Sequence, residues 1–461
     1  MCVSLVCPDG LESGNRGQYR PGGTRSSGAL RDSATRRSRD CSWAEPARFT
    51  LWCQTAPYPW LSHTMLEGIR VRISAFLLGL ACIAAGSASA QTLDYDRLDQ
   101  RLTQLSREDD MVGLAVAVID KGQIAFARGY GVTAYGESPV TKDTVFRWAS
   151  LSKGVASSLT AKLAMEGRFA LDDTLASFRT SLRLPGKGEE TATLEDLLAH
   201  RVGVVSNAYD TLLEDGRDPA DIRGRLAGLK VVCPIRDCHS YQNVAFDAVT
   251  EIVEAATGAT YSAAVDTSLF KPLNMTTAST GRAGLINSAS WAKPYEKKRD
   301  TPRPVRQTVK EPYYKVPAAG GVNGSILDLA QFARAQMGLE PDVLTPETLE
   351  ALHMPRVYTP REQSRLSAHY EGRMKDARYA LGWRTYKYDV TGSRVVGHRG
   401  AVEGYRSLML FDPELDSGVV VLWNSNARRP VGIELEVMDM VYGLPPQDWM
   451  QIDGGGVGAA K

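Results

Sequence analysis

Short runs of strand-forming residues stand at both ends of the main part of this 461-residue chain, and a long helix-forming stretch separates them. Near the beginning, residues 114–119 and 124–130 flank the turn Asp120-Lys121-Gly122, which is the pattern of a β-hairpin. Further strand patterns occupy residues 379–388, 394–398, 407–411 and 418–423. Because strands must pair with one another, these runs predict one antiparallel sheet built from N-terminal and C-terminal strands.

The region between the two groups of strands, about residues 175–338, has mainly helical patterns separated by loops. Within it and after the last strand, helices are expected at residues 193–199, 246–256, 325–336 and 431–442. Another is expected from Ser150 to Glu166, where apolar residues recur at the spacing of an amphipathic helix. We therefore predict an α+β fold, in which helices flank the sheet, an all-α lobe is inserted, and the functional site lies between the two.

The residues before this region have the pattern of an export signal. After Met65 come two arginines, an apolar stretch at residues 73–85 and a small-residue cleavage site that ends at Ala90. The apolar stretch is shorter than the roughly 20 residues that span a bilayer. We therefore predict a signal peptide at residues 65–90 and a periplasmic or secreted protein without a transmembrane anchor. Residues 1–64 are expected to be an artefact of an upstream start codon or a disordered leader.

Composition excludes some classes of partner. The chain has 54 basic and 53 acidic residues, so no basic surplus points to nucleic acid. Its 43% hydrophobic and 23% charged residues are ordinary for a globular protein. We expect one globular domain at residues 91–445, followed by a disordered, Gly-rich tail at residues 446–461. The oligomeric state is not predicted.

Two cysteines remain once the leader and signal peptide are set aside, Cys233 and Cys238. Exported proteins meet an oxidising compartment, in which two nearby cysteines can form a disulfide. Metal binding is the alternative, but with His239 they reach only three of the four ligands of a structural zinc site. The remaining histidines show no paired-ligand spacing. We therefore expect a local disulfide, with no metal and no cofactor.

The tetrad Ser150-Leu151-Ser152-Lys153 is the first candidate for chemistry. Residues i and i+3 share a helix face, so the lysine amine can approach the serine hydroxyl. The backbone N–H groups at a helix start also stabilise negative charge there. A second S-x-x-K, from Ser290 to Lys293, lies in a stretch rich in Lys, Arg and Pro without a clear helix after it. Context therefore favours Ser150 as a nucleophile.

Two further elements could complete such a site. Tyr241-Gln242-Asn243 offers a phenol and an amide within the helical region, and His398-Arg399-Gly400 ends a predicted strand. A nucleophile needs a neighbouring base and an acid for the leaving group, which these side chains can supply. No G-x-S-x-G occurs in the chain, which argues against an α/β-hydrolase.

With these three elements in this order, the chain resembles the serine β-lactamase and penicillin-binding protein family, and most of all the class C branch with its related DD-peptidases, D-aminopeptidases and esterases. The resemblance spans nearly the whole chain after the signal peptide and includes FRWASLSKGVASSL, YQNVAFDAVTEIVEAATG and VPAAGGVNGSILDLAQFA. It implies that Ser150 is acylated, that Lys153 takes the serine proton, and that Tyr241 serves as acid or base for the leaving group and the deacylating water.

The same resemblance implies residues that bind the substrate. Asn243 would bind the acyl amide, and the oxyanion hole would be the backbone N–H groups of Ser150 and Ala401. Asn207 lies near the place where class C enzymes have another amide-binding side chain. Each of these assignments is an expectation carried over from the family.

The third element departs from the family pattern. Class C β-lactamases have Lys-Thr-Gly where this chain has His398-Arg399-Gly400. A histidine with an unperturbed pKa near 6.5 is mostly neutral at pH 7, so it holds a substrate carboxylate less well than lysine. Arg399 could restore the charge if its side chain reaches the pocket. Efficient β-lactam turnover is therefore in doubt, whereas the acyl-transfer residues are intact.

The leading hypothesis is a secreted serine hydrolase acting on β-lactams and D-Ala peptides, with a small molecule or cell-wall peptide as substrate. A carboxylesterase or D-amino-acid amidase is the second reading. The alternative of another class is a non-catalytic sensor that binds cell-wall peptides or penicillin. In such a protein we would expect the S-x-x-K or the Y-x-N motif to be broken, and both are intact in this chain.

Overall fold

The computed structural model describes residues 93–370 and 372–454. The predicted leader at residues 1–64 and the predicted signal peptide at residues 65–90 lie outside the described residues. Within the described part of the chain, every helix is too short or too polar to cross a membrane.

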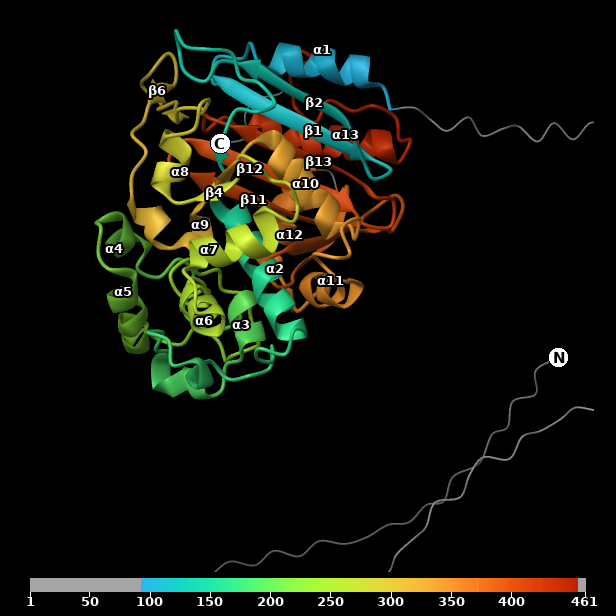
Figure 1. Cartoon of the computed structure of the whole chain (residues 1–461). Helices are drawn as coiled ribbons and strands as arrows, with labels where there is room; N and C mark the ends of the chain where they lie inside the picture. The colour runs from blue at the N-terminus through green and yellow to red at the C-terminus, as the bar shows by residue number, and fades with distance from the viewer. Residues whose placement is uncertain (1–92, 371, 455–461) are drawn as a thin grey trace, which may run out of the picture. The chain divides into compact units, whose positions relative to one another are not determined.

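Eight strands form one antiparallel sheet in the order β2-β1-β13-β12-β11-β10-β9-β8 (Figure 1). Their bounds are Gly113–Asp120 (β1), Gln123–Gly131 (β2), Val357–Tyr358 (β8), Met374–Tyr379 (β9), Arg384–Tyr388 (β10), Arg394–Val402 (β11), Tyr405–Asp412 (β12) and Ser417–Trp423 (β13). The first hairpin joins the C-terminal strands through β1 and β13, where Leu114 faces Trp423 and Ile119 faces Gly418. The predicted sheet from both ends of the chain is thus confirmed.

Five short strands lie outside this sheet. They are β3 (Phe146–Arg147), β4 (Ser279–Thr280), β5 (Tyr295–Glu296), β6 (Val305–Arg306) and β7 (Val322–Gly324). Strand β7 pairs with both β3 and β4, so it ties the segment before the tetrad to the middle of the chain.

Of the strand expected at residues 379–388, only residues 384–388 form one strand, β10; Tyr379 is the last residue of β9, and residues 380–383 form a tight turn between the two. Gly382 in this turn has φ of +74°, and a Cβ there would lie 2.3 Å from Ser157 Oγ and 2.7 Å from Lys153 O. Glycine therefore lets the turn both reverse the chain and touch the helix of the tetrad. Local periodicity did not reveal this reversal, because the residues on either side of it are equally strand-forming.

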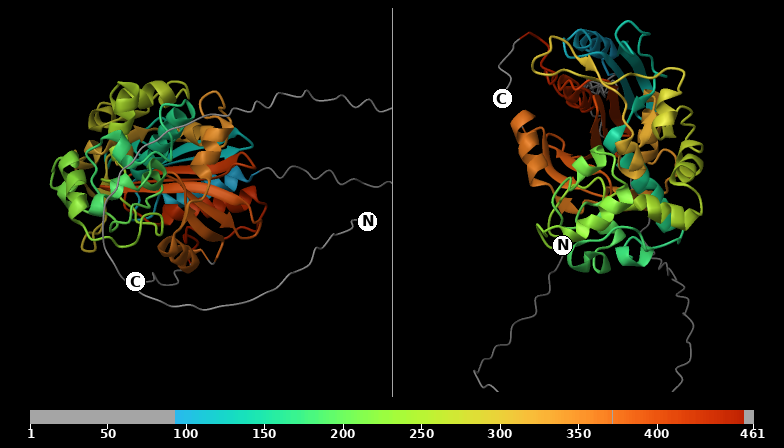
Figure 2. Two further views of the ribbon diagram at one scale, coloured as in Figure 1. Left: turned by 90° about the horizontal axis from the view of Figure 1, so that it is seen from below. Right: turned by 90° about the vertical axis from the view of Figure 1, so that its left-hand side faces the viewer.

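Helices cover both faces of the sheet, and β1 shows this directly. Its Ala115, Ala117 and Ile119 pack in one core, whereas Leu114, Val116 and Val118 pack in the other. The first core includes residues of α10 (Ile326–Gln336), and the second includes residues of α1 (Tyr95–Leu105), α12 (Pro360–His369) and α13 (Ile433–Val441). Figure 2 shows helices on both sides of the sheet. Burial on both faces explains why β1 is almost continuously apolar.

The helical lobe lies below the sheet in Figure 1 and contains α3 to α7. Their bounds are Leu194–Leu198 (α3), Asp210–Glu214 (α4), Pro219–Arg225 (α5), Ala248–Thr257 (α6) and Tyr261–Val265 (α7). The remaining helices are α2 (Ser152–Met165), α8 (Arg282–Ile286), α9 (Pro317–Gly320) and α11 (Pro346–His353).

The expected limit of this lobe at residue 338 is too late, because α10 packs on the sheet. Ser325 is the N-cap of α10 and forms a capping box with Asp328, which agrees with the helix predicted at residues 325–336.

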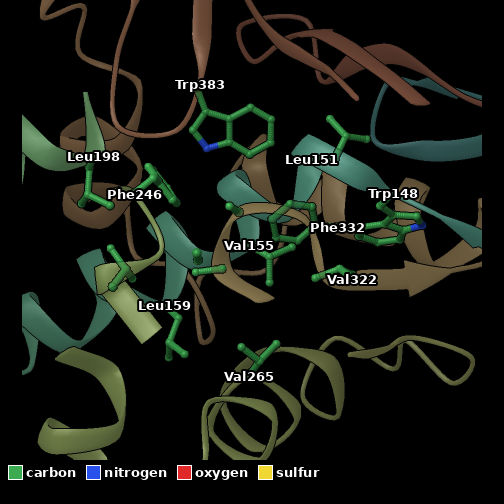
Figure 3. Close-up of a cluster of buried hydrophobic side chains, with 14 of the residues drawn as sticks. Trp148, Leu151, Val155, Leu159, Leu198, Phe246, Val265, Val322, Phe332 and Trp383 are labelled. Atoms are coloured by element: carbon green, nitrogen blue, oxygen red, sulfur yellow. The ribbon is translucent and has the colours of Figure 1, made fainter. Parts of the chain in front are cut away.

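Helix α2 passes through the core between the lobe and the sheet (Figure 3). Every residue from 152 to 161 is buried, so the helix is not amphipathic as its leucine spacing suggested. Small residues at Gly154, Ala156 and Ser157 allow neighbours to approach the faces between the larger side chains. Its surroundings include Trp148, Leu198, Phe246, Val265, Phe332 and Trp383.

The predicted disordered tail at residues 446–461 is wrong for its first part. Residues 446–454 pack against the body of the protein, with Met450 fully buried. Arg101 on α1 forms ion pairs of 2.6 Å with both Asp448 and Asp453. The segment alone does not show this order, because the residue that holds it, Arg101, lies about 350 positions away in the sequence.

Candidate active site

Ser150 lies in a 3-10 turn, η1 (Ala149–Leu151), that leads into α2. The residue before it, Ala149, has φ of +50°, a left-handed conformation that costs a non-glycine residue about 1–3 kcal/mol. Contacts with two other segments hold this turn. The N–H of Trp148 donates to Val322 O at 2.9 Å, and the hydroxyl of Ser407 donates to Trp148 O at 2.6 Å.

Gly400 on β11 touches this turn from the other side. A Cβ at Gly400 would lie 2.4 Å from Trp148 O, 2.3 Å from Ser407 Oγ and 3.0 Å from the Cβ of Ala149. Only glycine lets the strand approach this closely. The glycine of the third element therefore positions the turn that carries Ser150.

The side chain of Lys153 is fully buried, and its amine has three oxygen neighbours. Lys153 Nζ lies 3.5 Å from Ser150 Oγ, donates to Asn243 Oδ1 at 2.7 Å and donates to Ala319 O on α9 at 3.0 Å. The S-x-x-K spacing accounts for the first contact, because Lys153 stands three residues after Ser150. The other two come from distant segments and aim the amine at the hydroxyl.

The ring of Tyr241 lies against the same amine, with its centroid 4.7 Å from Lys153 Nζ. It also stacks with the ring of His398 at 6.3 Å between centroids. Two bonds hold its backbone: the N–H of Asn207 donates to Tyr241 O at 2.8 Å, and the N–H of Gln242 donates to His200 Nδ1 at 3.2 Å. Asn207 thus supports Tyr241 through its backbone, while its own side chain is exposed.

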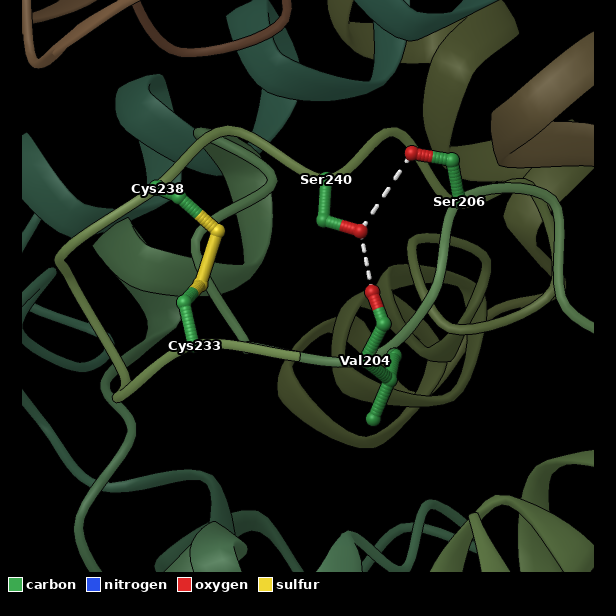
Figure 4. The surroundings of a disulfide bond; sticks show 5 residues. All are labelled: Val204, Ser206, Cys233, Cys238 and Ser240. Carbon is green, nitrogen blue, oxygen red and sulfur yellow. Dashed lines mark hydrogen bonds between the residues drawn. A yellow bond between two sulfur atoms is a disulfide. The ribbon is translucent and has the colours of Figure 1, made fainter. Parts of the chain in front are cut away.

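A disulfide between Cys233 and Cys238 closes the loop that leads to Tyr241 (Figure 4). The predicted pairing of these cysteines is confirmed. Ser240 then bonds through its hydroxyl to Val204 O, and its N–H donates to His200 O at 2.8 Å. The cystine and these bonds together fix the approach of the chain to the Y-x-N segment.

His398 is buried behind Tyr241, and both of its ring nitrogens are engaged. Nε2 lies 3.0 Å from the hydroxyl of Tyr379, and Nδ1 lies 2.8 Å from Arg399 O. Since a carbonyl can only accept, Nδ1 carries the proton and Nε2 accepts from the tyrosine. Burial, together with the nearby charges of Arg384 and Lys153, holds the pKa of His398 well below its usual value. The ring is therefore neutral at pH 7.

Arg399 is not brought into the site. Its guanidinium pairs with Glu434 on α13 and donates to the hydroxyl of Tyr370 at 3.1 Å. Consecutive residues of a strand point to opposite faces of the sheet. Because His398 faces the site, Arg399 faces the helices on the other side, and the expectation that it could hold a substrate carboxylate is wrong for this structure.

Ala401, the proposed second oxyanion donor, is exposed and stands one residue beyond the contact of Gly400 with the Ser150 turn. It lines an open cavity of about 390 Å³ beside the site. Other lining residues include Glu214, Lys310, Tyr313, Glu403 and Arg406. The cavity is thus lined by charged groups of both signs.

Sequence reasoning missed three partners of the predicted residues. Ala319 contributes a backbone oxygen to Lys153, and Tyr379 donates to His398. Asp210 on α4 accepts a hydrogen bond of 2.7 Å from Asn243 Nδ2. Each comes from a segment far along the chain from its partner, and no local motif marks it.

The second S-x-x-K forms no comparable site. Lys293 pairs with Glu137 at 2.8 Å, and the hydroxyl of Ser290 lies 3.1 Å from that of Thr144. Among the residues that the structure describes, no three His, Cys, Asp or Glu side chains are grouped as a metal site would require.

The family model described as Beta-lactamase matches residues 98–437. Among curated proteins, Unguisins hydrolase ungD' of Aspergillus campestris is 24% identical over 72% of this chain and 62% of its own length. Protein flp of Staphylococcus aureus is 25% identical over 68% of this chain and 60% of its own length. The match therefore spans about three fifths of these relatives.

Solved structures share the fold. An octameric penicillin-binding protein homologue from Pyrococcus abyssi has a TM-score of 0.68 with 23% identity, over 77% of this chain and 78% of its own. A class C beta-lactamase has a TM-score of 0.60 with 20% identity, over 76% and 96%. A D-stereospecific amidohydrolase from Streptomyces has a TM-score of 0.54 with 19% identity, over 70% and 93%.

Proposed function

Because the chain belongs to the beta-lactamase family, a family of serine hydrolases, we propose that it cleaves amide or ester bonds through an acyl-enzyme on Ser150. One observation supports this most strongly. Two fixed acceptors, Asn243 Oδ1 and Ala319 O, hold the buried amine of Lys153 next to the Ser150 hydroxyl.

The three contacts of Lys153 suit both ends of a proton transfer. A neutral amine has two N–H groups, which Asn243 and Ala319 take, and one lone pair, which faces Ser150 Oγ. When Ser150 attacks the carbonyl carbon, its proton can pass to that lone pair, and the resulting ammonium keeps all three oxygen neighbours. The transfer thus requires no movement of the lysine.

Tyr241 is proposed to pass a proton to the leaving group and to activate the water that later releases the acyl group. Its ring lies between Lys153 and His398, so the phenol belongs to the same cluster as the amine. The N–H groups of Ser150 and Ala401 would stabilise the oxyanion, for which one donor contributes about 3–4 kcal/mol. Water then attacks the acyl-enzyme, and Ser150 recovers its proton.

The third element favours substrates without a free carboxylate. His398 is neutral with both nitrogens bonded, and Arg399 faces away, so neither replaces the lysine of class C enzymes. We therefore rank amidase or esterase action above action on β-lactams and D-Ala peptides, both of which carry a carboxylate. The fold shared with a D-stereospecific amidohydrolase supports an amide substrate.

Fluorophosphonate labelling tests the nucleophile. We expect the protein to be labelled and Ser150→Ala to be inert, because the reagent bonds to an activated serine oxygen. Ser290→Ala, the serine of the other S-x-x-K, is the matched control and should label like the parent. Equal labelling of Ser150→Ala and the parent would refute the proposal, and no labelling of the parent would favour a non-catalytic binding protein.

Substrate class is tested by one set of rate measurements. A chromogenic cephalosporin, a p-nitrophenyl ester and a D-amino-acid p-nitroanilide are compared by kcat/KM. We expect the ester or anilide to exceed the cephalosporin by at least about tenfold. The reverse order would restore the β-lactam reading.

Export is part of the same proposal. The Cys233–Cys238 disulfide supports an oxidising compartment such as the periplasm, where such bonds persist. Mass spectrometry of protein secreted by the native cell, with an N-terminus at Gln91, would test it. Retention of the protein in the cytoplasm would contradict it.

A further inference from the structure

Asn243 connects the buried lysine to a carboxyl group outside the three motifs. Its Oδ1 accepts from Lys153 Nζ at 2.7 Å, and its Nδ2 donates to Asp210 Oδ2 at 2.7 Å. A side-chain amide has distinct ends, so a partner at each end determines which way it points. Without an acceptor at Nδ2, nothing in this pair of contacts would prevent the amide from turning its N–H groups toward the lysine.

Asp210 is placed for this role by the loop that carries it. The loop contains left-handed residues at Asn207, with φ of +55°, and Tyr209, with φ of +60°, before α4 begins at Asp210. The N–H of Asn207 donates to Tyr241 O, and the N–H of Asp210 donates to Asn207 O at 3.2 Å. The loop is therefore tied to the Y-x-N segment by its backbone as well as by the Asp210 carboxylate.

An ordinary structural role does not account for this carboxylate. The N-terminal cap position of α4 is Tyr209, and the side chain of Asp210 accepts from no backbone N–H of that helix. Its other oxygen, Oδ1, is buried without a hydrogen-bond partner. Burial raises the pKa of Asp210, while its bond with Asn243 and the charge of Lys153 oppose this rise. Asp210 is half-buried, and a carboxyl group drawn partly out of water needs polar partners such as Asn243 to offset the cost of its lost hydration.

We propose that Asp210 is a positioning residue of the Ser150 site: it orients the amide of Asn243, keeps Oδ1 on Lys153, and places a negative charge where Lys153 gains a proton. This inference rests on the proposed function. The second N–H of Asn243 Nδ2 remains available for a substrate acyl group, so the same bond also fixes the side from which the substrate is held.

Other charged or titratable groups around Asp210 are known from the structure. Three such groups affect its pKa: the charge of Lys153 on α2 and the hydroxyl of Tyr313 in η6 (Pro312–Lys315) lower it, and the charge of Glu214 on α4 raises it. Of these, only Lys153 is linked to it through Asn243. Removal of the Asp210 charge therefore changes the electrostatic environment of the Lys153 amine, which activates Ser150.

The test uses the rate of fluorophosphonate labelling, with thermal unfolding measured for every variant. We expect Asp210→Ala to label about 10- to 100-fold more slowly, because the amide loses its partner. Asp210→Asn can keep the hydrogen bond without the charge, so it should lose less rate. Asp215→Asn, an exposed aspartate just after α4, is the matched control.

A double variant separates a positioning role from a structural one. If Asp210 acts through Asn243, then Asp210→Ala should slow labelling no further in an Asn243→Ala background. Labelling of Asp210→Ala within twofold of the parent, or a full additional loss in the double variant, would overturn the inference. These outcomes differ from failure of the proposed function, in which the parent protein itself is not labelled.

Discussion

Gly400→Ala should damage the site without touching any group that reacts. The added Cβ would lie 2.4 Å from Trp148 O and 2.3 Å from Ser407 Oγ. Ordinary contacts begin at 3.4 Å, so the strand and the turn must separate by about 1 Å. One of the atoms is backbone, so a change of side-chain rotamer cannot relieve the clash. Overpacking of this kind costs about 1–3 kcal/mol of stability.

The effect on activity should exceed the effect on stability. Trp148 and Ala149 directly precede Ser150, so the displacement moves the hydroxyl away from Lys153 Nζ, which already lies 3.5 Å away. A misplacement of about 1 Å typically costs about 10²-fold in rate. We therefore expect fluorophosphonate labelling to slow about 100-fold while the protein stays folded.

The assay compares labelling rate and urea unfolding with a matched glycine. Gly224, in the helix α5, has an ordinary negative φ, and a Cβ added there would meet no heavy atom within 4 Å. Gly224→Ala should therefore be stabilising by up to about 1 kcal/mol with an unchanged rate. If Gly400→Ala labels within twofold of the parent, then close packing of β11 against the turn does not position Ser150.

Three further predictions concern stability. Cys238→Ser should lower the free energy of unfolding by about 2 kcal/mol, as the chain-entropy model gives for so short a loop, and reductant should then have no added effect on urea unfolding. Arg399→Met should lower the free energy of unfolding by about 3–5 kcal/mol, because it leaves Glu434 buried without its ion-pair partner. The folded variant should still react with fluorophosphonate at the rate of the parent. A KM raised only for substrates with a carboxylate would contradict this. Burial lowers the pKa of His353 to about 3, so the unfolded state binds a proton at this residue before the folded state does, and the protein loses stability as pH falls below about 6.5. His353→Gln removes this group, so between pH 6.5 and pH 5 its free energy of unfolding in urea titrations should fall by about 2 kcal/mol less than that of the parent. An equal fall in the two proteins would refute this.

Much of the fold was predictable because its signals are local. The strand-forming run of β1, the turn at Gly122 and the helix that begins after Ser325 each depend on residues within a few positions of one another. The contact of Lys153 with Ser150 belongs to the same class, since a helical turn brings residues i and i+3 together. The Cys233–Cys238 disulfide does too, because the loop between them is short.

The turn between β9 and β10 and the docking of residues 446–454 were not predictable in this way. The turn at Gly382 depends on the surface of α2, and the terminal segment depends on Arg101. In both cases the deciding partner lies on a remote segment. Periodicity reports how one segment is patterned, but it does not report what that segment packs against.

Two ordered motifs already indicate which groups could react: the serine and lysine of S-x-x-K and the tyrosine of Y-x-N. The neighbours that hold these groups in place follow from the packing of distant segments. Adjacent residues of a strand face opposite sides of the sheet, so His398 and Arg399 cannot both reach the site. The register of β11 in the sheet determines that His398 is the one that does. Likewise, Asp210 meets Asn243 because a loop folds back across 33 positions. Packing of distant segments sets such contacts, and no short stretch of sequence contains them.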